Sequence, residues 1–267
     1  MTSPQSSAGR PPRLAGESAL VTGSTSGIGR AIALEFAAEG ARVVVHGRDE
    51  ARGREVVDAA RAAGGDATFV AADLADTGAC ADLVDAAATA LGGLTVLVNN
   101  AVGAVTGHDA RVGEMDLAHW ESALLVNLTA PMLLCRAALP HMLAAGHGSI
   151  VNVSSRQAER PSPGLAAYAA SKGGLNALTR ALAVEYASAD IRCNTLSPGY
   201  VFNDRRDADL DDARRARLEG MHLTRLGTAR DAAYAAVYLA SRESGFLTGI
   251  NLQLDGGSSI GRALTFG

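Results

Sequence analysis

The chain contains 267 residues, of which 48% are hydrophobic, and carries a net charge of −4 at pH 7. This length fits one large α/β domain or two small ones, and the apolar fraction is sufficient for a sizeable core. The negative charge, without a basic stripe, gives no reason to expect a nucleic-acid partner.

The cysteines and histidines indicate neither disulfides nor a metal centre. Cys80, Cys135 and Cys193 are widely separated and odd in number, and the six histidines also lack ligand spacing. We therefore expect reduced core thiols in a cytoplasmic protein and no catalytic metal.

The beginning of the chain, residues 1–13, is polar and contains Ser, Gly and Pro without an apolar stretch. This composition predicts a disordered tail and not a signal peptide, followed by a single domain over residues 14–267. We find no apolar run long enough to span a bilayer, so we expect no membrane partner.

Short β-branched runs alternate with longer stretches rich in Ala and Leu along the rest of the chain. The runs predict strands at residues 19–22, 42–46, 68–71, 94–98, 149–153, 191–196 and 250–254. The longer stretches predict helices at residues 29–39, 50–63, 78–90, 117–143, 165–186 and 230–240, with 207–219 helical if ordered. Pro131 is expected to kink the helix over residues 117–143.

The predicted strands do not alternate cleanly between apolar and polar residues, which indicates burial on both faces. Strand–helix alternation throughout is typical of a doubly wound sheet. The sequence thus predicts an α/β fold, a single doubly wound Rossmann domain with a seven-stranded parallel sheet flanked by helices.

The first predicted strand is joined to the first helix by a glycine-rich turn, Thr22-Gly23-Ser24-Thr25-Ser26-Gly27-Ile28-Gly29. Glycine lets the backbone turn tightly and approach a ligand, and the helix N-terminus offers unpaired N–H groups to a phosphate. The spacing is neither the GxGxxG fingerprint nor a P-loop, so by itself it is equally typical of a tight turn. Its place after the first strand of a doubly wound pattern favours a dinucleotide site.

The end of the second strand bears on the choice of cofactor. In dinucleotide folds an acid at this tip binds the ribose 2′-OH, whereas a nearby Arg suits a 2′-phosphate. Here the strand ends His46-Gly47-Arg48, and Asp49 follows at once. This pattern favours NADP(H) over NAD(H); the alternative is that Arg48 is an ordinary solvated residue.

Lys172 is the single lysine of the chain and stands four residues after Tyr168. Residues four apart on a helix lie on one face, so the phenol and the ammonium should face the same space. An ammonium is a compact point charge and guanidinium a planar fork, so a retained lysine suggests a role that arginine cannot fill. For these two residues alone, a surface pair without a role is the alternative.

Several short motifs follow one another in a fixed order. Taken together, they resemble the short-chain dehydrogenase/reductase family, in its 3-oxoacyl-reductase-like branch, over roughly residues 14–257. The motifs are Thr22-Gly-x3-Gly-Ile-Gly29, Asp73-Leu74, Asn99-Asn100-Ala101, Asn127, Ser154-Ser155, Tyr168-x3-Lys172, Pro198-Gly199 and Asp255-Gly256-Gly257.

The resemblance implies a catalytic tetrad of Asn127, Ser155, Tyr168 and Lys172. Tyr168 would exchange a proton with the substrate oxygen, and the neighbouring ammonium would lower a tyrosine pKa that is ordinarily about 10. Lys172 would also bind the nicotinamide ribose hydroxyls, and Ser155 would hold the substrate oxygen. Asn127 would hold a water that links Lys172 to solvent. Each residue also has a structural alternative, such as a strand-end hydroxyl for Ser155.

The resemblance also implies the contacts of the cofactor. Asp73 would contact the adenine amino group, and Leu74 and Ala101 would line the adenosine half. Asn99 would brace adjoining strands. The residues predicted to bind cofactor are Gly23, Thr25, Ser26, Gly27, Ile28, Gly29, Arg48, Asp73, Leu74, Asn100, Ala101, Tyr168, Lys172, Pro198, Gly199 and Val201.

Two positions depart from the family pattern. Val102 follows Asn-Asn-Ala where the family usually has glycine, and its methyl groups would crowd the nicotinamide ribose or shift the loop. Asn203 stands where the family often has Thr or Ser, and its amide can both donate and accept in place of that hydroxyl.

The resemblance implies an NAD(P)(H)-dependent oxidoreductase, a short-chain alcohol dehydrogenase or ketoreductase that interconverts a secondary alcohol and a ketone by hydride transfer. A 3-oxoacyl thioester reductase with an acidic carrier protein is the alternative, but residues 137–155 contain no Lys or Arg to receive such a partner. We therefore favour a free small-molecule ketone or secondary alcohol as substrate. A non-catalytic NAD(P)-binding sensor is a further alternative, which the complete Ser-Tyr-Lys set disfavours. The family's usual assembly implies a homotetramer or homodimer.

Overall fold

Seven parallel strands form one sheet, in the spatial order β3-β2-β1-β4-β5-β6-β7. They are β1 (Ser18–Val21), β2 (Arg42–Gly47), β3 (Asp66–Ala71), β4 (Val96–Asn99), β5 (Gly148–Val153), β6 (Ile191–Pro198) and β7 (Asn251–Leu254). The computed structural model describes residues 11–103, 109–203 and 207–261. The strand order reverses between β1 and β4, as in a doubly wound Rossmann sheet, which confirms the predicted fold class.

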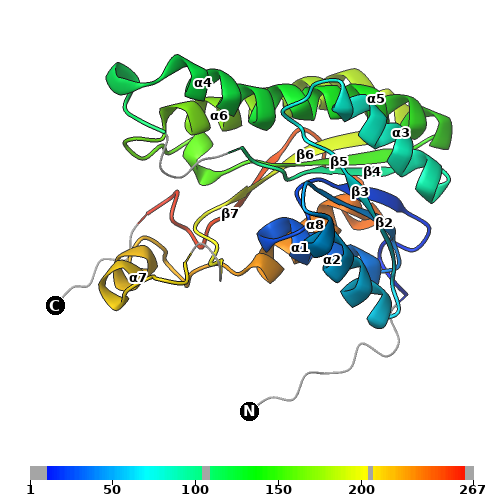
Figure 1. Ribbon diagram of the computed structural model, residues 1–267, viewed down its shortest axis with the longest axis horizontal. Coiled ribbons are helices and arrows are strands. Elements are labelled where there is room, and N and C mark those ends of the chain that lie inside the picture. Colours follow the sequence, from blue (N-terminus) through cyan, green and yellow to red (C-terminus); the bar gives the residue numbers. More distant parts are fainter. Residues whose placement is uncertain (1–10, 104–108, 204–206, 262–267) are drawn as a thin grey trace, which may run out of the picture.

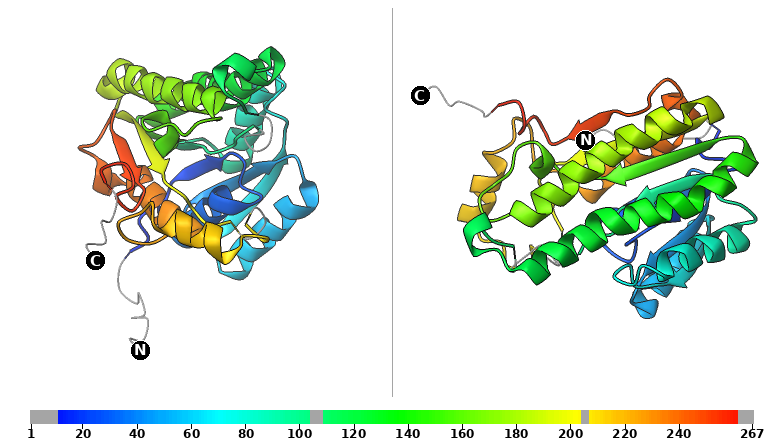
Figure 2. Two further views of the ribbon diagram at one scale, coloured as in Figure 1. Left: turned by 90° about the vertical axis from the view of Figure 1, so that its left-hand side faces the viewer. Right: turned by 90° about the horizontal axis from the view of Figure 1, so that it is seen from above.

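Helices cover both faces of the sheet (Figures 1 and 2). One face carries α1 (Gly27–Ala38), α2 (Glu50–Ala62) and α8 (Ala229–Ala240). The other face carries α3 (Ala79–Leu91), α5 (Ala130–Ala145) and α6 (Ala166–Tyr186), with α4 (Leu117–Leu124) packed against α6. The short helix α7 (Asp212–Glu219) lies beyond the edge of this three-layer arrangement.

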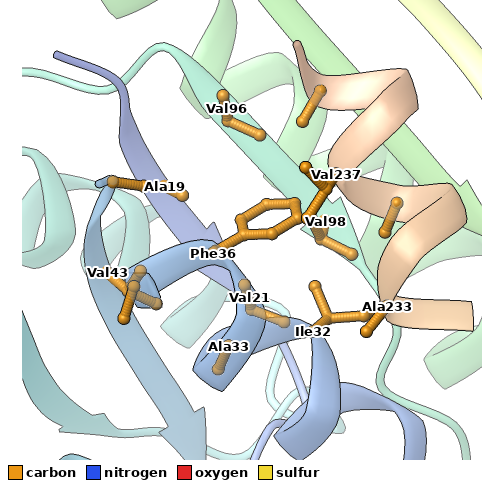
Figure 3. Packing of buried hydrophobic residues seen from close by; sticks show 14 of the residues in the cluster. Ala19, Val21, Ile32, Ala33, Phe36, Val43, Val96, Val98, Ala233 and Val237 are labelled. Carbon is orange, nitrogen blue, oxygen red and sulfur yellow. The ribbon is translucent and has the colours of Figure 1, made fainter. Parts of the chain in front are cut away.

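The core on the α1 side holds the helix that follows the glycine-rich turn against the sheet (Figure 3). Phe36 and Ile32 of α1 are fully buried and pack against strand valines such as Val21 and Val98, with Val237 of α8 beside them. Burial of each such side chain contributes about 2 kcal/mol. The other core covers the opposite face, so the inner strands β1, β4 and β5 are buried on both faces, whereas the edge strands β3 and β7 are only partly buried.

The long helix predicted over residues 117–143 is divided in the structure. A π-helical segment, Leu125–Thr129, separates α4 from α5 and stands directly before Pro131 in the first turn of α5. Pro131 has no N–H to donate to the carbonyl of Asn127 four residues earlier, which accounts for the break in α-helical bonding there. The expected disturbance of the helix by Pro131 is therefore present, and it lies in the residues that precede the proline.

By length and composition, the helical stretch Leu117–Ala145 is apolar enough to cross a membrane, contrary to the expectation that the chain has no apolar run of that length. In the structure this stretch lies along the sheet between α3 and α6 (Figure 2). Its residues Leu134, Cys135 and Ala138 are buried in the core of that face. Burial in the core thus accounts for part of the apolar character of this stretch.

Among the expected boundaries that shift, two are explained by side-chain contacts. The predicted disordered tail falls mostly on residues 1–10, outside the described part of the chain, but Arg13 at its end is bound: its guanidinium donates to Glu39 at 2.6 Å. The helix expected over residues 207–219 begins only at Asp212, because the Asp211 carboxylate caps it by accepting from the Arg214 N–H.

Candidate functional site

The carboxyl ends of the strands open into a cavity of about 690 Å³. Segments that follow β1, β3 and β4 line it, together with the ends of β2, β5 and β6. In open α/β sheets ligands bind at this edge, near the point where the strand order reverses. Every residue that the sequence predicted for the cofactor lines this cavity, and so does Ser155.

The glycine-rich turn has the geometry of an anion cradle. Gly23 has φ +62° and Gly27 φ +53°, conformations that favour glycine. A Cβ added at Gly23 would lie 2.7 Å from Ala101 Cα, and one at Gly27 would lie 2.8 Å from the Asn203 amide nitrogen. The turn leads into the N-terminus of α1, whose first residues line the cavity, so a dinucleotide pyrophosphate fits this place.

His46, at the end of β2, supports the turn and was given no role by the sequence analysis. Its Nδ1 accepts from the Gly23 N–H at 3.1 Å, and its Nε2 donates to the Ala72 carbonyl at 3.2 Å. The ring is therefore neutral with the proton on Nε2. Burial lowers the pKa of His46 to about 4, so it stays neutral across the physiological range.

Charged side chains surround the opening of the cavity near β2 and β3. Arg48 lies 3.8 Å from Asp73, and both side chains are more than half exposed. Asp49 caps α2 by accepting from the Arg52 N–H, and its other oxygen pairs with the Arg52 guanidinium at 3.0 Å. The carboxylate of Asp49 is thus engaged within its own helix.

Tyr168 and Lys172 lie one turn apart on α6 and both line the cavity. The Lys172 ammonium lies 5.8 Å from the centre of the Tyr168 ring and donates to the Val153 carbonyl at 2.8 Å. Lys172 is only 3% exposed, and this burial lowers its pKa to about 8. The lone lysine is therefore a buried charge beside the phenol, rather than half of a surface pair.

The two consecutive serines after β5 have different environments. Ser154 is buried, and its hydroxyl donates to the Lys172 carbonyl at 3.3 Å, which holds α6 against the strand. The Ser155 hydroxyl accepts from the Gln157 N–H at 3.1 Å and remains half-buried at the cavity. Ser154 and Ser155 thus both line the cavity with Tyr168 and Lys172, and Ser154 is the one whose hydroxyl bonds to α6.

Asn127 is buried in the π-helical segment and is not among the residues that line the cavity. Its side-chain oxygen accepts from the Gly103 N–H at 2.9 Å, and its amide nitrogen donates to the Ser171 hydroxyl at 3.2 Å. Asn127 therefore ties the segment after β4 to α6. Asn99 likewise links adjoining strands, as expected, by donating to Asn152 at 2.8 Å.

Within residues 11–103, 109–203 and 207–261, no group of three or more His, Cys, Asp or Glu side chains is placed to hold a metal ion. Val102 lines the cavity and is 51% exposed, so its methyl groups occupy space that glycine would leave open. Asn203 also lines the cavity, above Gly27.

Comparison with known proteins finds reductases and dehydrogenases that match nearly the whole chain. A family model described as enoyl-(acyl carrier protein) reductase matches residues 23–259. A 2,5-dichloro-2,5-cyclohexadiene-1,4-diol dehydrogenase of Sphingobium indicum is 38% identical over 249 residues, covering 93% of this chain and 98% of the relative. A 3beta-hydroxysteroid dehydrogenase of Eggerthella lenta is 39% identical over 259 residues, covering 95% and 98%. The crystal structure of a 3-oxoacyl (acyl-carrier-protein) reductase from Agrobacterium tumefaciens with NADP bound has TM-score 0.86 and 34% identity, covering 91% of this chain and 94% of that one.

The chain therefore belongs to the short-chain dehydrogenase/reductase family. It is an NAD(P)-dependent oxidoreductase of the alcohol dehydrogenase/ketoreductase class.

Proposed function

We propose that this enzyme interconverts a secondary alcohol and a ketone on a free small molecule with NADP(H), and that Tyr168 exchanges the proton. The observation that carries the proposal is the buried Lys172 ammonium 5.8 Å from the Tyr168 ring, in the cavity that also contains Ser155 and the glycine turn. A nearby cation favours the phenolate, the form in which tyrosine acts as a base.

The nicotinamide, when bound, takes up or gives the hydride. Tyr168 gives its proton to the substrate oxygen in reduction and removes it in oxidation. Ser155 orients that oxygen by a hydrogen bond, and Lys172 supplies the charge that favours proton release from the phenol. The Lys172 ammonium has three N–H donors, and one of them bonds to the Val153 carbonyl. The others can donate to ribose hydroxyls.

Asn127 enters this scheme through its position. Its side chain is committed to Gly103 and Ser171, so we assign the proposed water between Lys172 and solvent to the backbone carbonyl of Asn127. The side chain then keeps that carbonyl in place by holding the π-helical segment against α6.

NADP(H) is favoured by the charges around the adenosine end. Arg48 and Arg52 both line the cavity, whereas the Asp49 carboxylate is engaged in capping α2 and pairing with Arg52. The exposed Arg48 guanidinium suits a 2′-phosphate, whereas Asp49 and Arg52 are paired with each other, and a paired carboxylate is poorly placed to accept from a ribose 2′-OH. The relative from Agrobacterium tumefaciens was solved with NADP bound.

A 3-oxoacyl thioester is the second candidate substrate, because that same relative is described as a 3-oxoacyl (acyl-carrier-protein) reductase. We favour a free substrate because residues 137–155, which reach the cavity at Ser155, contain no Lys or Arg to attract an acidic carrier. Comparable turnover of carrier-bound 3-oxoacyl chains and free ketones would reverse this choice.

Assembly and location are also part of the proposal. Leu117, Leu143 and Val184 expose apolar side chains on α4, α5 and α6, as expected for helices that meet a second copy in a homodimer or homotetramer. Cys80, Cys135 and Cys193 are free and buried, which is compatible with the reducing cytoplasm. Light scattering on the purified protein measures the assembly directly.

The proposal is tested by Tyr168→Phe in a cofactor-paired screen of ketones and secondary alcohols, followed at the nicotinamide absorbance. We expect turnover to vanish while dinucleotide still binds, since only the phenolic hydroxyl is removed. Near-normal turnover in this variant would overturn the role of Tyr168. Absence of turnover by the wild type with either cofactor across the panel would contradict the proposed substrate class.

A further inference from the structure

The N-terminus of α6 is capped by a residue from a distant part of the chain. Leu165, at the N-cap position, has an apolar side chain that cannot accept a hydrogen bond. Instead the two carboxylate oxygens of Asp109 accept from the Ala167 N–H at 3.2 Å and from the Tyr168 N–H at 2.9 Å. These are the second and third N–H groups of the helix, the ones that an N-cap side chain normally satisfies.

Gly103, which like Asp109 follows β4, bonds to a second member of the proposed tetrad, Asn127. It donates its N–H to the Asn127 side chain at 2.9 Å. The Asn127 amide in turn donates to Ser171, whose hydroxyl donates to the Tyr168 carbonyl at 2.7 Å. Tyr168 is therefore held at its N–H by Asp109 and at its carbonyl by a chain that leads back to Gly103.

We propose that Asp109 is a positioning residue for catalysis, which fixes the first turn of α6 and with it the Tyr168 phenol relative to Lys172 and Ser155. The inference rests on the proposed function, because it assumes that Tyr168 exchanges the proton with substrate.

The physical reason lies in the place of Tyr168 on its helix. Tyr168 is the third residue of α6, and first turns fray when their N–H groups lack acceptors. Lys172 lies a turn deeper, where the bond to Val153 holds it independently of the cap. Loss of Asp109 would thus loosen the phenol and leave the ammonium in place. A misplacement of about 1 Å is sufficient to lower a rate by about 10²-fold.

The test compares Asp109→Ala and Asp109→Asn with Thr228→Ala. Thr228 caps α8 on the opposite face of the sheet, so its variant removes a helix cap without touching α6. We expect Asp109→Ala to lower kcat at least about tenfold with less than about threefold change in the dinucleotide Kd. Asp109→Asn, which keeps one accepting oxygen, should fall between it and the wild type, and Thr228→Ala should lower Tm but keep kcat.

The outcomes separate the two proposals. Wild-type kcat in Asp109→Ala, or an equal loss of kcat in Thr228→Ala, would overturn the positioning role while the function of the enzyme stands. A loss of dinucleotide binding in parallel with kcat would also overturn it, because the damage would then reach the whole cavity. Activity that persists in Tyr168→Phe would instead remove the premise about Tyr168.

Discussion

The two ends of the cavity hold their charges in opposite ways. Near β2 and β3, Arg48 and Asp73 form a loose pair with side chains 78% and 54% exposed. At the other end Lys172 is 3% exposed, and its ammonium is the cation beside Tyr168. Exposed charges are screened by water and salt, whereas a buried charge acts strongly over a short distance. The exposed end can therefore change its residues with small effects on stability, and the buried end cannot.

Lys172→Arg keeps the charge and changes only the shape of the cation, yet it should lower kcat far more than any change at the exposed end. A planar guanidinium cannot occupy the place of the ammonium between Val153 and the phenol, so we expect kcat to fall by about 10²- to 10⁴-fold. Steady-state kinetics measure the loss. Arg180→Lys, on the exposed face of the same helix, is the matched control and should retain wild-type kcat. If Lys172→Arg keeps most of its activity, the buried end of the cavity tolerates a change of cation as well as the exposed end does, and the contrast between the two ends is wrong.

His46 is the buried exception at the exposed end, and its effect should appear as pH dependence of stability. The pKa of His46 is about 4 in the folded chain and 6.5 when unfolded, so between these values only the unfolded chain binds the proton. Stability from this group is complete above pH 6.5 and is lost as the pH falls toward 4, by about 3 kcal/mol. Urea unfolding of wild type and His46→Gln measures it.

The glutamine can bond Gly23 and Ala72 without titrating, so the stability of the wild type should fall below that of His46→Gln as the pH falls. Parallel curves for the two proteins between pH 7 and pH 4.5 would show that His46 is not the group responsible.

Lys172→Met should stabilise the protein without bound cofactor while abolishing turnover. The pKa of Lys172 is about 8 in the folded state against 10.5 unfolded, so below pH 8 the buried charge lowers stability by about 3 kcal/mol. Loss of the bond to Val153 offsets about 1 kcal/mol of that gain. Denaturant unfolding at pH 7 should therefore show a gain of about 2 kcal/mol.

The sign of the pH dependence provides the check on this prediction. Between pH 8 and 10.5 the unfolded chain retains the Lys172 proton and the folded chain loses it, so wild-type stability should rise relative to Lys172→Met. If the difference in unfolding free energy between the two proteins does not narrow over this range, the buried charge of Lys172 is not its cause.

Arg48→Ala should give the smallest effect, confined to cofactor choice. An exposed guanidinium contributes about 1 kcal/mol to a phosphate contact, so the ratio of kcat/KM for NADPH over NADH should fall about fivefold. Arg54→Ala removes another exposed arginine, which pairs with Glu50 within α2, and it should leave the ratio unchanged. A wild type that prefers NADH would refute the cofactor proposal itself.

Much of the fold was predictable because its signals are local. Strands such as β1 and β2 contain short runs of buried apolar residues, and the glycine turn requires glycine where φ is positive. Helix boundaries were less predictable because caps compete for the same side chains. Arg215 could pair with Asp211 or Glu219; the structure has Asp211 capping α7 and Arg215 bonded to Glu219 at 3.1 Å.

The residues missed by sequence reasoning all act across segments. His46 bonds to Gly23 and Ala72, which lie 23 and 26 residues away, and Asp109 bonds to Tyr168 at a separation of 59 residues. No spacing rule connects such positions, because their contact depends on how β2 and β3, or the segment after β4 and α6, are brought together. For His46, a polar residue at the end of β2 was the one available signal.

The sequence alone determined the class of fold, the family and the cluster of residues that line the cavity, because those follow from local periodicity and from motifs with fixed spacing. Tertiary structure decided that Lys172 is desolvated, that His46 is neutral, that Asn127 bonds to its neighbours and not into the cavity, and that Asp109 caps α6. These properties depend on burial and on hydrogen bonds between distant segments, and both exist only once the chain has folded.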